Sequence, residues 1–249
     1  MTQPTGRMPR CFALVPCAGV GARSGADRPK QYVPLGGRPM VAHTLAALAA
    51  VPRIEATLVV LSDDDALFDE LLPGWAAGAP GRWLARCGGA TRAATVANGL
   101  GALHAQGVHD DDWVLVHDAA RCLLQPEWVE RLIDACIADP VGGLLALPLA
   151  DTLKQADADG RVAATVDRAG KWAAQTPQMF RLGALRRALA EAGDAVTDEA
   201  SALEAVGQAP RLVVGDALNF KVTYPGDFGL AARLLGAGPA PAGPQENTR

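Results

Sequence analysis

The sequence lacks an excess of positive charge. Its 23 Lys and Arg residues stand against 27 Asp and Glu residues, so the formal net charge is −4. A chain without an overall basic field has no general attraction for nucleic acid or for an anionic membrane surface. We therefore expect neither as a partner, and any site for a polyanion must come from a local cluster of cations.

The sequence also has few cysteines and no long apolar run. Its five cysteines are odd in number and include no Cys-x-x-Cys pair, which argues against a disulfide framework and a structural zinc site. The longest apolar stretches fall well short of the roughly 18 residues that cross a bilayer. The segment after Arg10 has no signal-peptide core. These absences predict a cytoplasmic protein in a reducing compartment.

What is present is the composition of a globular protein. Of the 249 residues, 49% are apolar and 20% are charged, which excludes wholesale disorder, collagen and coiled coil. We expect one folded domain over residues 10–235. The ends, residues 1–9 and 236–249, are rich in Pro, Gly and polar residues without periodicity and are predicted to be flexible.

Short β-type runs alternate with longer stretches in which apolar residues recur at helical spacing. The predicted strands are residues 11–16, 57–62, 113–117, 144–148 and 211–214. The predicted helices include residues 39–50, 91–105, 126–138 and 225–235. This rhythm is typical of βαβ units, so we predict an α/β fold, Rossmann-like, with a mostly parallel sheet flanked by helices. Ligands of such sheets bind beyond the carboxyl ends of the strands.

The segment 149–171 breaks this rhythm. Residues 149–156 and 161–166 resemble two strands joined by an Asp-Ala-Asp-Gly turn, which predicts a protruding β-hairpin arm. A two-stranded hairpin is only marginally stable by itself in water. Two arrangements stay open: an arm that leans on a second subunit, and a β-meander that folds against its own domain.

A glycine-rich segment with several cations follows the first predicted strand. Gly19 and Gly21 let backbone N–H groups approach anionic oxygens, while Arg23 and Lys30 neutralise charge. The pattern is neither a dinucleotide fingerprint nor a Walker A motif, because no Lys-Ser/Thr follows the glycines. It indicates a phosphate-binding loop, and a glycine-rich turn with solvated cations is the alternative.

The segment His117-Asp118-Ala-Ala-Arg121 follows the predicted strand 113–117. The Asp118 carboxylate is a hard oxygen ligand for a divalent cation, and Arg121 can face a phosphate across it. Alternatively, Asp118 caps the next turn and pairs with Arg121 in a structural ion pair. We expect His117 to be structural rather than catalytic.

Two further clusters contribute candidate site residues. Gly89 and Thr95 stand at a helix start, where N–H groups can donate to a base, a ribose or a phosphate, and a plain strand-to-helix turn is the alternative. Lys221 adds a cation, and Asp216 is a candidate second metal ligand. Residues 197–199 are expected to begin a helix with a hydroxyl cap, and we expect no catalytic role for them.

Six motifs, taken in order, resemble one family. They are the loop ending Arg-Pro-Lys-Gln, Gly-Gly-x-x-Arg, His-Asp-Ala-Ala-Arg, Thr-Val-Asp-Arg-x-Gly-x-Trp-x-Ala-x-Thr-Pro-Gln, Thr-Asp-Glu-Ala-Ser and Asn-Phe-Lys-Val-Thr. Over most of the chain the sequence resembles the 2-C-methyl-D-erythritol 4-phosphate cytidylyltransferases. The resemblance implies transfer of CMP from CTP to that sugar-alcohol phosphate, with Mg²⁺ as cofactor, in non-mevalonate isoprenoid precursor biosynthesis. It also implies a homodimer in which each β-arm completes the partner's site.

The resemblance assigns roles to individual residues. It implies catalytic roles for Arg23, Lys30, Asp118 and Lys221. It implies substrate contacts for Gly19, Gly21, Gly89, Thr95, Arg121, Thr152, Arg168 and Thr176, of which Thr152 and Arg168 come from the arm of the other subunit. It places magnesium at Asp118. Because a phosphate monoester is already anionic at neutral pH, the reaction needs positioning and charge neutralisation rather than a base.

Three residues depart from the family pattern, and two other functions stay open. Cys122 stands where Pro is usual, Ala90 where an acidic residue is common, and Tyr224 where a basic residue is usual. None of them removes a charge to which a role is assigned. The alternatives are a ribitol-5-phosphate cytidylyltransferase, which the phosphate loop does not exclude, and a domain that binds CTP without reacting.

Overall fold

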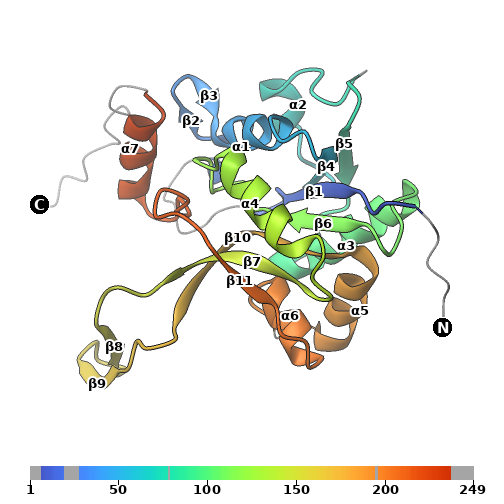
Figure 1. Cartoon of the computed structure of the whole chain (residues 1–249). Helices are drawn as coiled ribbons and strands as arrows, with labels where there is room; N and C mark the ends of the chain where they lie inside the picture. The colour runs from blue at the N-terminus through green and yellow to red at the C-terminus, as the bar shows by residue number, and fades with distance from the viewer. Residues whose placement is uncertain (1–6, 20–27, 78, 194–195, 237–249) are drawn as a thin grey trace, which may run out of the picture.

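A computed structural model of the chain describes residues 7–19, 28–77, 79–193 and 196–236. A seven-stranded sheet forms its centre, and helices cover both faces of the sheet (Figure 1). This confirms the predicted α/β fold with helices on either side of a mostly parallel sheet. The predicted flexible ends lie largely in residues 1–6 and 237–249, outside the described residues.

The direction of the strands decides where a site can form. In spatial order the strands are β11 (Arg211–Val214), β7 (Gly142–Pro148), β10 (Trp172–Arg181), β6 (Trp113–Val116), β1 (Cys11–Pro16), β4 (Ile54–Leu61) and β5 (Arg82–Arg86). Strand β10 is antiparallel to both of its neighbours, and every other pairing in the sheet is parallel. The carboxyl ends of six strands therefore meet at one edge.

Alternating side chains of the strands bury both faces of the sheet. Along β1, Ala13 and Val15 point to one face, whereas Phe12 and Leu14 point to the other. The first face is covered by α1 (Met40–Ala49), α2 (Leu67–Leu71) and α4 (Pro126–Cys136). The second is covered by α3 (Arg92–Ala105), α5 (Leu182–Ala192) and α6 (Glu199–Ala205).

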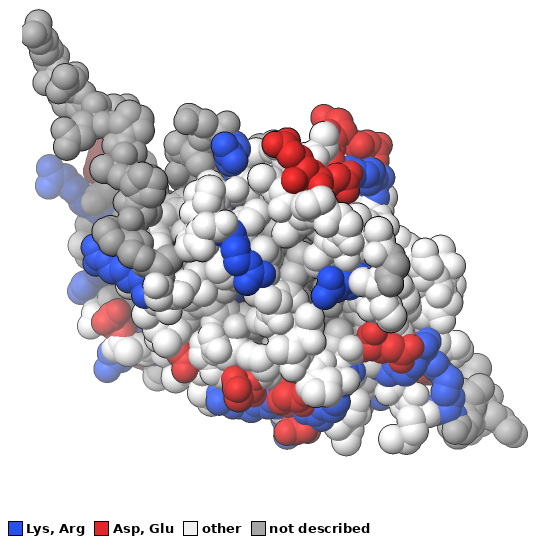
Figure 2. All heavy atoms as spheres, turned by 90° about the horizontal axis from the view of Figure 1, so that it is seen from above, with Lys and Arg blue, Asp and Glu red and all other residues white. Residues whose placement is uncertain are grey.

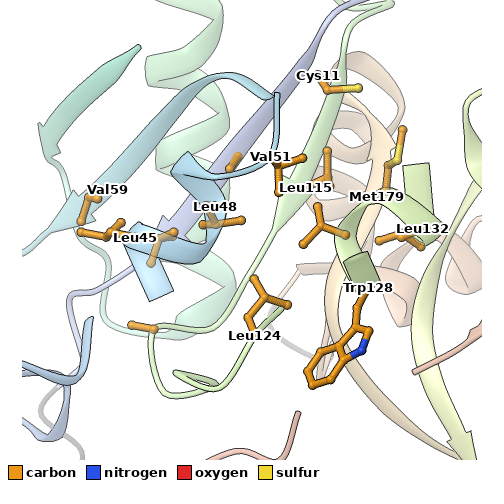
Figure 3. Close-up of a cluster of buried hydrophobic side chains, with 14 of the residues drawn as sticks. Cys11, Leu45, Leu48, Val51, Val59, Leu115, Leu124, Trp128, Leu132 and Met179 are labelled. Carbon is orange, nitrogen blue, oxygen red and sulfur yellow. The ribbon is translucent and has the colours of Figure 1, made fainter. Parts of the chain in front are cut away.

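The cluster on the first face is drawn in Figure 3. Leu48 and Leu115 are fully buried in it, and burial of such a side chain stabilises the fold by about 1.5–3 kcal/mol. The residues labelled there are Cys11, Leu45, Leu48, Val51, Val59, Leu115, Leu124, Trp128, Leu132 and Met179. The rigid sheet fixes the strand ends from which the site is built.

A smaller apolar cluster lies apart from the two faces of the sheet. It joins the short hairpin of β2 (Pro34–Leu35) and β3 (Arg38–Pro39) to helix α7 (Pro225–Leu234). The short 3₁₀ helix η2 (Lys30–Tyr32) precedes this hairpin. The structure thereby brings the segments around residues 30 and 221 together, although 190 residues separate them in the sequence.

The β-arm is a separate two-stranded sheet that projects from the body (Figure 1). Its strands are β8 (Leu153–Ala156) and β9 (Val162–Val166), and most of their side chains are exposed. The hairpin does not fold against its own domain, so the meander alternative is wrong. Strand β8 begins later than predicted because the N–H of Leu149 donates to the carbonyl of Lys171 at 3.0 Å and still continues the β7–β10 pairing.

Strand β10 is the main element that the pattern did not predict. Pro177 interrupts its apolar pattern, and proline cannot donate a ladder hydrogen bond. The register of β10 against β7 shifts between Ala174 and Gln178, which accommodates this proline. Strand β5, helix α2 and helix α5 were likewise not predicted. Strands β1 and β11 have the predicted bounds.

The surface carries charges of both signs. On the face shown in Figure 2, Lys and Arg atoms form small separate groups, some beside Asp and Glu atoms and some among uncharged atoms, and no continuous basic field is visible there. Among the described residues, no helix combines the length and the apolar character that a membrane crossing requires.

Candidate active site

A cavity of about 390 Å³ opens at the carboxyl ends of β1 and β6. Its lining comes from the segment after β1, the turn η2, the start of α3, the segment after β6 and the segment between β11 and α7. The lining residues are Pro16, Cys17, Ala18, Gly19, Lys30, Gln31, Gly89, Ala90, Thr91, Arg92, Thr95, Asp118, Ala119, Ala120 and Lys221. The structure thus brings together Gly19, Lys30, Gly89, Thr95, Asp118 and Lys221, as predicted.

Asp118 is the charged centre of this cavity. Its Oδ1 accepts from Nε of Arg92 at 2.8 Å, and its Oδ2 lies 2.8 Å from Nζ of Lys221 and 3.9 Å from Nε of Arg121. Burial raises the pKa of Asp118, but Arg92 and Lys221 outweigh this and hold the pKa well below its ordinary value. The carboxylate therefore stays ionised. The predicted pairing with Arg121 exists, but Arg92 and Lys221 are the closer partners.

Arg92 and Glu199 form a part of the site to which the sequence analysis assigns no role. Nη1 and Nη2 of Arg92 donate to Oε1 and Oε2 of Glu199 at 2.7 and 3.1 Å. Glu199 is only 1% exposed, and burial raises its pKa although Arg92 opposes the shift. Arg92 ends the Gly-Gly-x-x-Arg motif and Glu199 lies in the Thr-Asp-Glu-Ala-Ser motif, so their places in these motifs are the sequence signal that could have identified them. Helix α6 is capped by the Asp198 carboxylate rather than by a hydroxyl, which corrects the prediction.

Lys30 and the segment after β1 are held together by side chains of η2. Nε2 of Gln31 donates to the carbonyls of Cys17 and Gly19 at 3.1 and 2.9 Å. The buried hydroxyl of Tyr32 donates to Oδ2 of Asp65. Nζ of Lys30 donates to the carbonyl of Val222 at 3.0 Å. These bonds fix where the Lys30 ammonium lies.

The turn before α3 needs its glycines for close packing. A Cβ on Gly88 would lie 2.4 Å from Cβ of Ala18, and a Cβ on Gly89 would lie 2.5 Å from Cβ of Ala94. The N–H of Gly89 donates to Oγ1 of Thr95 at 3.0 Å. The sequence analysis predicts that N–H groups of this turn donate to a ligand, but the N–H of Gly89 donates to Thr95 instead.

A buried chain of hydrogen bonds supports Asp118 from β10. The hydroxyl oxygen of Thr176 accepts the N–H of Asp118 at 3.1 Å and lies 3.0 Å from Nδ1 of His117. Nε2 of His117 lies 3.2 Å from the carbonyl oxygen of Arg121. Burial lowers the pKa of His117 to about 4, so the ring is neutral at neutral pH. A neutral ring that donates from Nε2 accepts the Thr176 hydroxyl at Nδ1.

Arg121 joins three segments behind the cavity. Its Nη1 donates to the carbonyl of Asn219 at 2.6 Å, and its Nη2 donates to the carbonyl of Ala174 at 3.3 Å. Asn219 is fully buried and its Nδ2 donates to the carbonyl of Thr176 at 2.8 Å. The segments after β6 and β11 are thereby fixed to each other and to β10.

The remaining predicted site residues lie elsewhere. Gly21 and Arg23 lie outside the described residues. Thr152 and Arg168 are exposed on the arm and do not line the cavity of their own chain. Asp216 does not line the cavity either: its carboxylate accepts the N–H of Leu218 at 2.8 Å.

The donor set suits one magnesium ligand rather than a complete metal site. Within the ranges that the structure describes, no group of three or more His, Cys, Asp and Glu side chains could hold a metal ion. Magnesium is commonly held by one or two carboxylates together with water and substrate phosphates. The ionised Asp118 fits that mode, with the other oxygens supplied by a bound triphosphate.

The three departures from the family pattern fit their surroundings. Cys122 is 2% exposed and fills the apolar cluster that α7 covers. Ala90 lines the cavity, so it leaves apolar surface where a carboxylate is common. Tyr224 stands at the start of α7 and is exposed.

Comparisons with known proteins agree with these features. Residues 11–237 match the family model described as 2-C-methyl-D-erythritol 4-phosphate cytidylyltransferase. The bifunctional enzyme IspD/IspF of Albidiferax ferrireducens is 62% identical over 228 residues, which cover 91% of this chain and 53% of that protein. The chain thus spans about half the length of this relative.

Two single-function relatives are covered almost completely. The 2-C-methyl-D-erythritol 4-phosphate cytidylyltransferase of Laribacter hongkongensis is 60% identical over 230 residues, which cover 92% of this chain and 97% of that protein. A crystal structure of 4-diphosphocytidyl-2C-methyl-D-erythritol synthase superposes with a TM-score of 0.80 at 41% identity, covering 91% of this chain and 98% of that one. The resemblance drawn from the six motifs is confirmed: the chain belongs to the 2-C-methyl-D-erythritol 4-phosphate cytidylyltransferase family.

Proposed function

We propose that the cavity at the carboxyl ends of β1 and β6 is where this cytidylyltransferase transfers CMP from CTP to 2-C-methyl-D-erythritol 4-phosphate. The products are 4-diphosphocytidyl-2-C-methyl-D-erythritol and pyrophosphate, in isoprenoid precursor biosynthesis. The observation that carries the proposal is the buried, ionised Asp118 set among Arg92, Lys221 and Arg121 beside a glycine-lined cavity. Such a site neutralises phosphate charge without a nucleophilic side chain.

The CTP triphosphate binds along the segment after β1. A Cβ on Gly19 would meet no atom of the described residues within 4 Å, so these residues leave open space beside this backbone for a ligand. The Lys30 ammonium lines the same cavity. We assign Gly21 and Arg23, from the sequence, to the same phosphate chain. The cavity volume of about 390 Å³ falls in the usual range for small-molecule sites, about 300–1,000 Å³.

The nucleoside and the acceptor take opposite sides of Asp118. Gly89 and Thr95 line the wall at the start of α3, where the nucleoside binds. Lys221 lines the cavity from the segment after β11, where the acceptor phosphate binds, and we assign Arg121 and Thr176, from the sequence, to the same side. The donor and the acceptor therefore meet over the carboxylate.

The chemical step needs orientation rather than a base. An acceptor phosphate oxygen, already anionic, attacks the α-phosphorus of CTP, and a new P–O bond forms in line with the P–O bond that breaks. Pyrophosphate leaves with the electron pair of that bond. Arg23 and Lys30 stabilise the charge on the leaving oxygens, and Lys221 holds the attacking phosphate.

Magnesium is proposed as the cofactor, held by Asp118 and by oxygens of the triphosphate. When bound, it neutralises negative charge on the phosphate oxygens. Because Arg92 and Lys221 hold the pKa of Asp118 below its ordinary value, the chain presents a charged ligand at neutral pH.

We also propose that two chains share each site through the arm. An isolated hairpin with Val162 65% exposed needs a partner surface, and Thr152 and Arg168 lie away from their own cavity. Mixing Lys30→Ala chains with Arg168→Ala chains, at a sugar-alcohol phosphate concentration at which each variant alone turns over slowly, tests this, because a mixed dimer regains one site with both residues intact. Turnover above the sum of the two variants supports the shared site. No gain in turnover on mixing, together with a monomeric mass in solution, contradicts it.

The proposed domain and location follow from the sequence. We propose that residues 10–235 act as one nucleotidyltransferase domain in the cytoplasm, with neither nucleic acid nor a membrane as partner. The net charge of −4 and the absence of Cys-x-x-Cys pairs support this.

One assay tests the activity itself. The enzyme is incubated with CTP, Mg²⁺ and either 2-C-methyl-D-erythritol 4-phosphate or ribitol 5-phosphate, and pyrophosphate release is measured. We expect fast release only with the first acceptor. Faster release with ribitol 5-phosphate would favour that activity, and CTP binding without release would favour the non-catalytic alternative.

A further inference from the structure

Two buried carboxylates share one guanidinium beside the cavity. Arg92 donates from Nε to Asp118 and from both terminal nitrogens to Glu199, at distances between 2.7 and 3.1 Å. Asp118 lines the cavity, whereas Glu199 does not and is 1% exposed. Glu199 therefore reaches the site only through Arg92.

We propose that Glu199 is a positioning residue that keeps the Asp118 carboxylate available to the metal-bound triphosphate. The inference rests on the proposed function. Glu199 occupies the two-nitrogen edge of the Arg92 guanidinium, so only Nε faces Asp118. One oxygen of Asp118 is then left to Lys221, whose side chain is 34% exposed, on the cavity side.

The geometry of guanidinium groups explains what happens without the Glu199 charge. An arginine next to a single carboxylate prefers the bidentate arrangement, in which two parallel N–H groups hold both oxygens. Arg92, deprived of Glu199, would turn that edge onto Asp118 and engage both Oδ atoms. Its full charge would also compete with a cation for the carboxylate. Metal-dependent binding of CTP would therefore weaken.

Helix α6 does not need the Glu199 carboxylate to stay in place. Gln178 on β10 accepts the N–H of Ala200 at 2.8 Å and donates to Oδ2 of Asp198 at 2.8 Å. Asp198 in turn caps the helix through the N–H of Ser201 at 2.9 Å. The helix start is thus anchored twice without Glu199, so this buried charge is assigned to Arg92 rather than to the helix.

Calorimetry with CTP separates positioning from a general structural effect. The dissociation constant for CTP is measured with saturating Mg²⁺ and again in EDTA, and the metal-dependent gain is the ratio of the two. Replacement of groups that orient metal ligands typically costs about 10- to 100-fold in metal affinity. We expect Glu199→Gln to reduce this ratio by about that factor, mainly through weaker binding in Mg²⁺.

Glu204→Gln is the matched control, since it removes the same charge from an exposed position on the same helix. It should keep the wild-type ratio. Arg92→Lys is the second variant, because an ammonium keeps the charge but cannot hold two carboxylates in one plane. It should lower the ratio as well, and it answers the question if Glu199→Gln does not fold.

Two results would refute the positioning role of Glu199 without affecting the activity of the wild type. In one, Glu199→Gln and Arg92→Lys have the same ratio of CTP dissociation constants as Glu204→Gln. In the other, both variants bind CTP more weakly by the same factor in Mg²⁺ and in EDTA. If the wild type shows neither metal-dependent CTP binding nor pyrophosphate release, the proposed function fails and the positioning role fails with it.

Discussion

Asp118→Asn removes one charge from the centre of the site and keeps the shape of the side chain. Lys221 and Arg121 then lose the carboxylate that faces them, and Arg92 keeps only its pair with Glu199. Breaking a buried ion pair by removal of one partner costs about 3–5 kcal/mol. In a chain of this length each kcal/mol lowers Tm by about 2–4 °C, so we expect a drop of roughly 6–20 °C.

The same substitution should strengthen CTP binding in the absence of metal and slow turnover in its presence. In EDTA, loss of the negative charge strengthens the attraction between the three cations and the triphosphate, so CTP binds more tightly than to the wild type. With Mg²⁺, loss of the ligand reduces kcat by about 10²–10³-fold, the usual cost of one preorganised electrostatic contact. Calorimetry and pyrophosphate release measure the two effects.

The contribution of Asp118 to stability should depend on pH. The pKa of Asp118 is lower in the folded state than in the unfolded chain, so its stabilisation is complete above the unfolded value of about 4 and is lost as pH falls through the folded value. The stability of Asp118→Asn should accordingly depend less on pH on the acid side. An unchanged Tm, together with wild-type turnover in Mg²⁺, would refute the role given to Asp118.

Three further predictions concern other parts of the molecule. Lys30→Ala should lower kcat with CTP by about 10²–10³-fold while the circular dichroism spectrum and Tm stay near wild type, and near-normal turnover would contradict its role. Arg168→Ala should raise KM for the sugar-alcohol phosphate more than KM for CTP, and a change in the CTP constant alone would count against it. Asp112→Asn should lower the free energy of unfolding by about 2–3 kcal/mol without changing kcat, because the fully buried carboxylate accepts the N–H groups of Arg10 and His109 and pairs with Arg7. The lowered pKa of Asp112 means that this contribution is present above about pH 4 and is lost at lower pH, which acid titration of both proteins monitored by circular dichroism measures.

Much of the fold follows from local pattern. Strand β1 and helix α3 have an apolar periodicity that their neighbours reinforce, and their bounds agree with prediction to within one residue. Strand β10 was missed because a proline and the buried polar residues Gln175, Thr176 and Gln178 interrupt its apolar pattern, and its place between β6 and β7 is set by long-range pairing. Periodicity contains no information about such pairing.

The part of the candidate site that lies at the carboxyl ends of the parallel strands could be predicted from the sequence. Gly19, Asp118 and Lys221 follow the carboxyl ends of strands, and these ends meet at one edge of the sheet. The bonds between Arg92 and Glu199 join residues 107 positions apart, and the partner of a buried charge is decided by packing rather than by spacing. The sequence showed that both residues stood in motifs, but not that they touch.

The antiparallel course of β10 has a consequence for how the arm can vary. The chain leaves the sheet along β7, turns at the tip of the arm and returns beside its own outward path, with Trp172 opposite Pro148. Residues inserted at the tip, near Gly160, lengthen the arm without altering this register, since the turn there is exposed. A residue inserted between Lys171 and Thr176 displaces the hydroxyl that accepts the N–H of Asp118. The length of the arm and the position of the Asp118 carboxylate can therefore change independently during evolution.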